Sequence, residues 1–403
     1  MKILMFGWEF PPFNTGGLGT ACYNLTKSLA KNNIDITFVL PKVPEDVKSD
    51  WVKIISAGNI SNIKIQGVIT KLSGYITSES YSRQVLSSRI PETSKTMYGK
   101  DLFEEVYRYS IRARQIAKDE AHDIIHCHDW MTYQAGKHAK SISGKPLVLH
   151  VHATEFDRTG GNVNQAVFEM EREGMHAADA IIAVSNFTKA QIVQHYGIDP
   201  TKVFVVHNSI DVAECSEHSC SGLKNNHKVV LFLGRVTLQK GPDYFLYAAK
   251  KVLEHEPDAR FIIAGSGDMA GAVVEKAAHL GIADKVLFTG FLRGPEIEKA
   301  YRMADVYVMP SVSEPFGLTA LEAMGNKTPV IISKQSGVSE VVGNCLKVDF
   351  WDTDRMANNI VAVLRYNAAY ETLRDNGYHE VRSFSWDKPA KKCIDIYNML
   401  GGH

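Results

Sequence analysis

The 403-residue sequence lacks several features that would narrow its function at once. It has no excess of either charge, because 45 Lys and Arg residues balance 45 Asp and Glu residues. No overall field therefore attracts nucleic acid or an acidic membrane. No apolar run approaches the ~20 residues that span a bilayer, and the stretch from Met1 to Gly7 is too short and strand-like for a signal peptide. We expect a protein with no transmembrane segment and no nucleic acid partner.

Cysteine is also scarce. The six cysteines are scattered, and no two of them have the two-residue spacing of a metal-binding or redox pair: Cys22, Cys127, Cys215, Cys220, Cys345 and Cys393. This pattern predicts reduced thiols in a cytoplasmic protein rather than a disulfide framework.

Short apolar runs alternate with longer amphipathic stretches along the whole chain. Such alternation predicts an α/β fold with two Rossmann-like, doubly wound parallel-sheet domains, one in each half. The runs lie at residues 3–6, 36–40, 124–127, 147–151, 180–184 and 203–206 in the first half, and at 229–233, 261–264, 286–289, 306–309 and 330–332 in the second.

A polar stretch without periodicity, residues 213–228, predicts the linker between the halves. We assign residues 1–215 to an N-terminal domain, 216–383 to a C-terminal domain, and 384–403 to a closing helix that packs back on the first domain. Residues 42–100 interrupt the alternation with a long Ser-rich segment. Such a segment serves as a lid or binding surface, or only as added structure, and for its first half we favour a structural hairpin.

A helix-start motif lies between Ser313 and Glu322, with a glutamate on either side of the predicted helix terminus. Free amides at such a terminus favour an anion such as a diphosphate, and carboxylates accept hydrogen bonds from sugar hydroxyls. An ordinary capped helix with solvated glutamates is the alternative. The motif makes candidate ligand-binding residues of Glu314, Phe316, Gly317, Leu318, Thr319 and Glu322.

Two further loops follow predicted strands. Gly16 and Gly17 come after the first strand, where glycines allow close approach to a phosphate, but their spacing is not that of a dinucleotide-binding fingerprint. Arg235 and Lys240 follow the first strand of the second half, and Gly241 ends their loop. Two fixed cations there would offset the charge of a leaving diphosphate, whereas the alternative is a pair of exposed surface cations.

Histidines gather in two segments of the first half, residues 126–130 and 150–155. Alternate histidines on a strand share a face and could bind zinc, but no third cluster completes a site, so we expect no metal. We expect His152 to hydrogen-bond a sugar and Asp129 to face the acceptor, meaning the molecule to which that sugar would be transferred. His126 and His150 are expected to be interior imidazoles bonded to the backbone.

Together these motifs resemble a retaining glycosyltransferase of the GT-B fold, in the glycogen and starch synthase-like branch. The resemblance covers nearly the whole chain, and the pair Glu314 and Glu322, with Arg235 and Lys240 ahead of it, is its most specific part. It implies two domains that face a central cleft, retention of anomeric configuration without an established enzymic nucleophile, and no requirement for a divalent metal or pyridoxal phosphate.

The resemblance also implies roles for the candidate residues. Arg235 and Lys240 would hold the donor diphosphate with the amides of residues 317–319. Glu314 and His152 would contact the transferred sugar, and Glu322 would contact the nucleotide ribose. One position departs from the pattern, since Asn14 stands where bacterial glycogen synthases usually carry a lysine.

The implied reaction transfers glucose from UDP- or ADP-glucose to an α-glucan. Three alternatives stay open: transfer to a small or lipid-linked acceptor by the same machinery, nucleotide-sugar epimerisation, and sugar binding without catalysis. Intact cationic and acidic positions argue against binding alone, because binding does not require cations at a leaving group.

Overall fold

The structure is a computed structural model that describes residues 1–11, 16–42, 49–57, 100–212 and 227–401. The chain divides into two compact units. The N-terminal unit comprises Met1–Phe156, Asn162–Asn208 and Trp386–His403, and the C-terminal unit comprises Asp157–Gly161 and Ser209–Ser385. The short segment Asp157–Gly161 thus belongs with the second unit, although its sequence position falls in the first half.

A seven-stranded parallel sheet forms the centre of the N-terminal unit, in the order β3-β2-β1-β4-β5-β6-β7. Its strands are β1 (Lys2–Phe6), β2 (Asp35–Leu40), β3 (Lys53–Ser56), β4 (Ile124–His128), β5 (Leu147–Val151), β6 (Ala180–Ala183) and β7 (Val203–Val205). The central strands are buried throughout and apolar except for three histidines of β4 and β5, as is usual for a parallel sheet that is covered on both faces.

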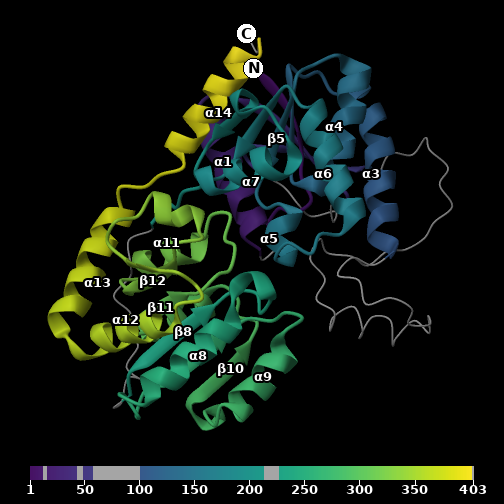
Figure 1. Cartoon of the computed structure of the whole chain (residues 1–403). Helices are drawn as coiled ribbons and strands as arrows, with labels where there is room; N and C mark the ends of the chain where they lie inside the picture. The colour runs from purple at the N-terminus through teal and green to yellow at the C-terminus, as the bar shows by residue number, and fades with distance from the viewer. Residues whose placement is uncertain (12–15, 43–48, 58–99, 213–226, 402–403) are drawn as a thin grey trace. The chain divides into compact units, whose positions relative to one another are not determined.

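Helices cover both faces of this sheet (Figure 1). One apolar core includes residues of α1 (Gly17–Lys31) and α14 (Asp387–Met399), and another includes residues of α3 (Lys100–Asp119), α4 (Trp130–Ser143) and α6 (Gln165–Ala177). The unit also contains α7 (Asn186–Tyr196) and η2 (Pro200–Lys202), and α5 (Glu155–Thr159) crosses its boundary. The closing helix α14 packs on α1, and Ser28 Oγ donates a 2.7 Å hydrogen bond to Asp387 Oδ1.

The C-terminal unit contains a six-stranded parallel sheet in the order β10-β9-β8-β11-β12-β13. The strands are β8 (Val229–Leu233), β9 (Arg260–Ala264), β10 (Val286–Gly290), β11 (Val306–Met309), β12 (Val330–Ser333) and β13 (Leu346–Val348). Its helices are η3 (Leu238–Lys240), α8 (Pro242–Leu253), α9 (Ala270–His279), η4 (Ala283–Lys285), α10 (Pro295–Met303), α11 (Leu318–Gly325), η5 (Gly337–Glu340), α12 (Thr353–Arg365) and α13 (Asn367–Val381).

The expected pair of parallel α/β sheets is confirmed. Two strands lie outside the predicted runs: β3, in the segment for which we favoured a hairpin, and β13. β3 pairs parallel to β2, so its pairing is not that of a hairpin. The predicted linker lies almost entirely outside the described residues, as does Asn14. Among the described residues, no helix combines the length and the apolar character that crossing a bilayer requires.

Candidate functional site

Two loops of the C-terminal unit lie side by side because the strands before them are neighbours. β8 pairs with β11, and the loops that follow these parallel strands leave the same edge of the sheet. Gly241 ends the first loop with φ +64°, and a Cβ at this position would lie 2.2 Å from the carbonyl oxygen of Pro310 in the second loop. A residue without a side chain is therefore required where the two loops touch.

The ammonium group of Lys240 and the carboxylate of Glu314 join these loops. Lys240 Nζ donates to Glu314 Oε2 at 2.5 Å, and the Ser311 hydroxyl donates to the same oxygen at 3.0 Å. The side chain of Glu314 is only 7% exposed, so the pair is largely removed from water. Among the described residues, Glu314 Oε1 accepts no hydrogen bond, which leaves this oxygen available for a ligand hydroxyl.

The start of α11 lies beside this ion pair in the sequence and in the fold. Gly317 precedes the helix with φ +110°, a conformation that side chains disfavour, and its position is enclosed by Met309 and Val338. The Tyr307 hydroxyl lies 2.8 Å from Thr319 Oγ1 and 3.2 Å from the carbonyl oxygen of Leu233, the last residue of β8. The first turn of α11, whose amides have no intrahelical acceptor, is thereby fixed to the end of β8.

Glu322 lies one turn further along α11. Its Oε2 accepts a 3.0 Å hydrogen bond from the Tyr301 hydroxyl, and the residue is half-buried. Burial raises the pKa of the Glu322 carboxyl, and the Tyr301 hydrogen bond opposes this rise. The second oxygen, Oε1, accepts no hydrogen bond from the described residues.

Arg235 and Phe316, two further candidates of the C-terminal unit, differ in accessibility. Arg235 is half-buried, and its Nη2 lies 3.3 Å from Gln239 Oε1. The side chain of Phe316 is 3% exposed, and its carbonyl oxygen accepts a 2.7 Å hydrogen bond from Val338 N. Phe316 thus packs in the interior and shapes the loop, so we do not expect its ring to contact a ligand.

The other four candidates belong to the N-terminal unit. Gly16 is the N-cap of α1, and Gly17 is exposed with open space around the position of a Cβ. Asp129 is fully buried, and its Oδ1 accepts hydrogen bonds from the amides of His152 at 2.7 Å and Ala153 at 3.3 Å. The expected contact of Asp129 with an acceptor does not fit this burial, and we propose instead that Asp129 positions His152.

The two histidine segments form one row on neighbouring strands, because β4 and β5 place His128 opposite His150. The rings of His126 and His128 stack at 4.5 Å, and those of His150 and His152 at 4.3 Å. His128 Nδ1 lies 3.0 Å from His152 Nε2. His152 alone of the four is partly exposed.

Burial keeps these imidazoles neutral. Burial lowers the pKa of His126 to about 3 and lowers the pKa values of His128 and His150 well below the ordinary value. It also lowers the pKa of His152, but by less, and the Asp129 carboxylate opposes this shift. The expected burial of His126 and His150 is confirmed, but their expected backbone bonding is not. His126 Nδ1 lies 2.6 Å from the Tyr397 hydroxyl, and neither ring nitrogen of His150 has a partner among the described residues.

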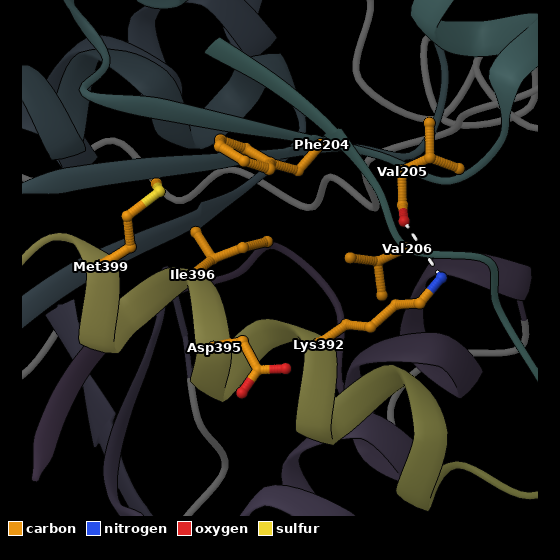
Figure 2. Close-up of a pocket in the computed structure, with 7 residues that line it drawn as sticks. All are labelled: Phe204, Val205, Val206, Lys392, Asp395, Ile396 and Met399. Carbon is orange, nitrogen blue, oxygen red and sulfur yellow. Dashed lines mark hydrogen bonds between the residues drawn. The ribbon is translucent and has the colours of Figure 1, made fainter. Parts of the chain in front are cut away.

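A pocket of about 290 Å³ lies elsewhere in the N-terminal unit, between β7 and α14 (Figure 2). Apolar side chains line most of it, and Lys392 reaches across to the carbonyl oxygen of Val205 at 3.5 Å. None of the predicted site residues lines this pocket. Its surroundings offer few of the charged groups that an anionic ligand requires, so we do not assign the site there.

Three supporting residues were not found from the sequence: Ser311, Tyr301 and Tyr307 each bond to a group of the predicted motif. Ser311 directly follows Pro310 in the same loop, so its closeness to Glu314 was a signal that could have been used. The tyrosines lie in α10 and β11, and no local pattern indicates that their hydroxyls turn toward α11. The contact of Ser313 Oγ with Asp157 Oδ1, at 2.5 Å, joins residues 156 positions apart and has no sequence signal.

Two known protein families match this chain in sequence, one in each half. Residues 15–214 match Glycosyltransferase Family 4, and residues 216–380 match Glycosyl transferases group 1. An uncharacterised glycosyltransferase of Methanocaldococcus jannaschii is 31% identical over 99% of this chain and 98% of its own length. A D-inositol 3-phosphate glycosyltransferase of Segniliparus rotundus is 30% identical over 70% of this chain and 67% of its own. A glycogen synthase of Mycobacterium tuberculosis is 26% identical over 85% and 80%.

Solved structures agree with this chain in fold. A sucrose-phosphate synthase of Thermosynechococcus elongatus superposes with a TM-score of 0.77 at 19% identity, covering 99% of this chain and 98% of its own. The Anabaena protein HepE, in complex with UDP and glucose, gives a TM-score of 0.71 at 18% identity and covers 99% and 100%. The GT-B fold class is thereby confirmed for the chain.

Proposed function

This chain belongs to the group 1 glycosyltransferases, which transfer a sugar from a nucleotide sugar, and from that premise we propose that it transfers glucose from UDP- or ADP-glucose to an α-glucan. We further propose that it retains the anomeric configuration. The comparisons support the glycosyltransferase family but do not single out its glycogen and starch synthase-like branch, because a D-inositol 3-phosphate glycosyltransferase is 30% identical and the glycogen synthase 26%.

The observation that carries the proposal is the arrangement of Lys240, Glu314 and the first turn of α11. A cation and a helix terminus together suit a leaving diphosphate, whose negative charge grows as the glycosidic bond breaks. A group that meets this charge mainly in the transition state speeds the chemical step more than it tightens binding. Arg235 adds a second cation from the same loop.

The carboxylate of Glu314 has a separate task in this proposal. Its Oε2 is held by Lys240 and Ser311, which fixes the orientation of Oε1 toward hydroxyls of the transferred sugar. Glu322 offers its own Oε1 in the same way to the ribose diol. Paired hydroxyl-to-carboxylate hydrogen bonds are strong enough to orient a sugar ring before reaction.

Two further assignments concern the N-terminal unit. We propose that His152, held by Asp129 through its backbone amide, donates a hydrogen bond to the transferred sugar. We propose that the amides after Gly16 and Gly17 approach the donor phosphates, where Asn14 brings no charge.

A second candidate function, transfer to a small phosphorylated or lipid-linked acceptor, is favoured by the inositol phosphate relative. Incubation with labelled UDP-glucose and ADP-glucose, each with glycogen, inositol phosphate or membrane extract, separates the two. Label in glycogen supports the main proposal. Label found only in inositol phosphate or in lipid would reject the glucan acceptor but keep the transferase, and nucleotide-sugar turnover without any acceptor would favour an epimerase.

Replacing Glu322 with alanine is expected to raise the KM for the donor several-fold while kcat changes less. The ribose lies away from the reacting bond. Loss of the Glu322 contact therefore weakens donor binding equally in the ground state and in the transition state. Steady-state kinetics with varied donor measure both constants. An unchanged donor KM would show that Glu322 does not contact the ribose.

Replacing Glu314 with glutamine should show the opposite pattern, with kcat falling more than donor affinity. The substitution keeps the shape but removes the negative charge that orients Lys240 and the sugar hydroxyls. Donor affinity, measured by calorimetry, serves as the reference. A large loss of affinity with kcat intact would contradict the proposed contact with the transferred sugar.

A further inference from the structure

We propose that His126, His128 and His150 of the N-terminal unit together bind one divalent transition-metal ion, with zinc as the first choice. The ion would be structural, since the family resemblance implies a transfer reaction that needs no metal. The proposal does not depend on the identity of the donor or acceptor.

Unpartnered ring nitrogens at the centre of the sheet are the first support. The three side chains are at most 1% exposed, and Nε2 of His126, Nε2 of His128 and both nitrogens of His150 have no partner among the described residues. A buried polar atom without a partner is costly, and native proteins rarely place several of them together. A metal ion would satisfy three of these nitrogens at once.

The spacing of the three imidazole rings is the second support. One ring nitrogen from each histidine lies within 4.8 Å of a ring nitrogen of the other two. Tetrahedral zinc with bonds of about 2.0–2.1 Å needs nitrogens roughly 3.3 Å apart, so the three rings must rotate out of their stacked orientations to close the site. The backbone supports are fixed, because β4 and β5 pair in register through His128 and His150.

The remaining nitrogens provide the third support. His126 Nδ1 is paired with the Tyr397 hydroxyl, and His128 Nδ1 with His152 Nε2. A metal-binding histidine characteristically uses its second nitrogen in such a bond, which fixes the ring orientation. In both rings the partnered nitrogen is Nδ1, and the nitrogen left over for a metal is Nε2.

The sequence favoured no metal because it showed two separate clusters and no third. The fold changes that premise, since adjacent strands merge both clusters into one row. Neutral imidazole, the form that burial favours, is also the form that binds metal.

A second group at the exposed end of the row competes for the assignment. Cys22, His128 and His152 also present ligand atoms within 4.8 Å of one another. We favour the all-histidine set because each of its rings has an unpartnered nitrogen, whereas two members of the second group, His128 and His152, already bond to each other. Only the second set contains a sulfur ligand, so a spectroscopic signal from a metal–thiolate bond distinguishes the two sets.

The test uses the full chain, produced without a histidine tag and loaded with zinc, then freed of loosely held ions. Elemental analysis is expected to find one zinc per chain in the wild type and almost none in His150→Leu. The control His138→Gln, which changes a histidine of α4 that bonds to the Ser110 carbonyl, should keep its zinc. Wild-type protein that holds no zinc after loading would overturn the proposal.

Thermal unfolding gives an independent readout. A strong chelator should lower the Tm of the wild type by several degrees and leave His150→Leu unchanged. Without a metal, exchanging an imidazole with two unpartnered nitrogens for leucine would instead raise the Tm, and the chelator would have no effect. That result would also overturn the proposal.

Cobalt substitution of the wild-type protein gives a third readout. The expected spectrum shows the d–d bands of tetrahedral cobalt without a thiolate charge-transfer band. A thiolate band that disappears in Cys22→Ser, while His150→Leu keeps its metal, would assign the ion to the Cys22 group and refute the all-histidine site.

Discussion

Replacing Lys240 with alanine is expected to lower kcat by roughly ten- to a hundred-fold, which corresponds to about 1.5–3 kcal/mol of lost transition-state stabilisation. Lys240 Nζ bonds to Glu314 Oε2 at 2.5 Å beside the first turn of α11. The variant removes a cation where a leaving diphosphate would gain charge, and it also frees the carboxylate of Glu314 from its orienting partner. Steady-state kinetics with saturating donor measure the loss.

A matched control comes from a second lysine ion pair in the same unit. Lys276 Nζ lies 3.0 Å from Asp243 Oδ2, and its side chain is 31% exposed, against 19% for Lys240. Lys276→Ala removes one positive charge from the same unit and should leave kcat within about two-fold of the wild type. If both variants lost activity equally, the effect would come from net charge or folding and not from the site.

The second large effect is structural. Gly241→Ala is expected to destabilise the protein by about 2–4 kcal/mol and to reduce activity with it. The residue has φ +64°, which costs a side chain about 1–2 kcal/mol, and its Cβ would lie 2.2 Å from the Pro310 carbonyl oxygen. Relief of this overlap must separate the loop of Lys240 from the loop of Glu314.

Gly281→Ala separates the two contributions to this loss. Gly281 has a similar φ of +69° in the same unit, but nothing lies within 4 Å of a Cβ there. The Gly281→Ala variant should therefore lose only the stability that a side chain at positive φ costs, and it should keep its activity. Denaturant unfolding of both variants measures the difference, and equal losses would show that the contact with Pro310 does not matter.

Local sequence pattern was sufficient for the sheets and for the residues that come directly after strands. Eleven predicted runs correspond to strands because a continuous run of Val and Ile is typical of a buried parallel strand. β3 and β13 were missed because they are short edge strands whose pairing depends on a neighbour and not on their own composition.

The supporting contacts could not be predicted in the same way. Tyr301 reaches Glu322 from another helix, and Tyr307 reaches Thr319 from β11, so both bonds depend on packing between separate elements. The row of histidines could not be predicted from the sequence for the same reason. Alternation on each strand was visible, but the register that places His128 opposite His150 follows from the sheet order.

Protection against thermal unfolding by a nucleoside diphosphate shows whether the C-terminal unit binds the donor diphosphate at Lys240 and α11. We expect either UDP or ADP at millimolar concentration to raise the Tm, since a ligand that binds only the folded state stabilises it by about 2.7 kcal/mol at a hundred times its Kd. The rise should be largely lost in Lys240→Ala and kept in Lys276→Ala. If no nucleoside diphosphate raised the Tm, or if the rise were the same in both variants, the assignment of Lys240 and the α11 terminus to a donor diphosphate would be contradicted.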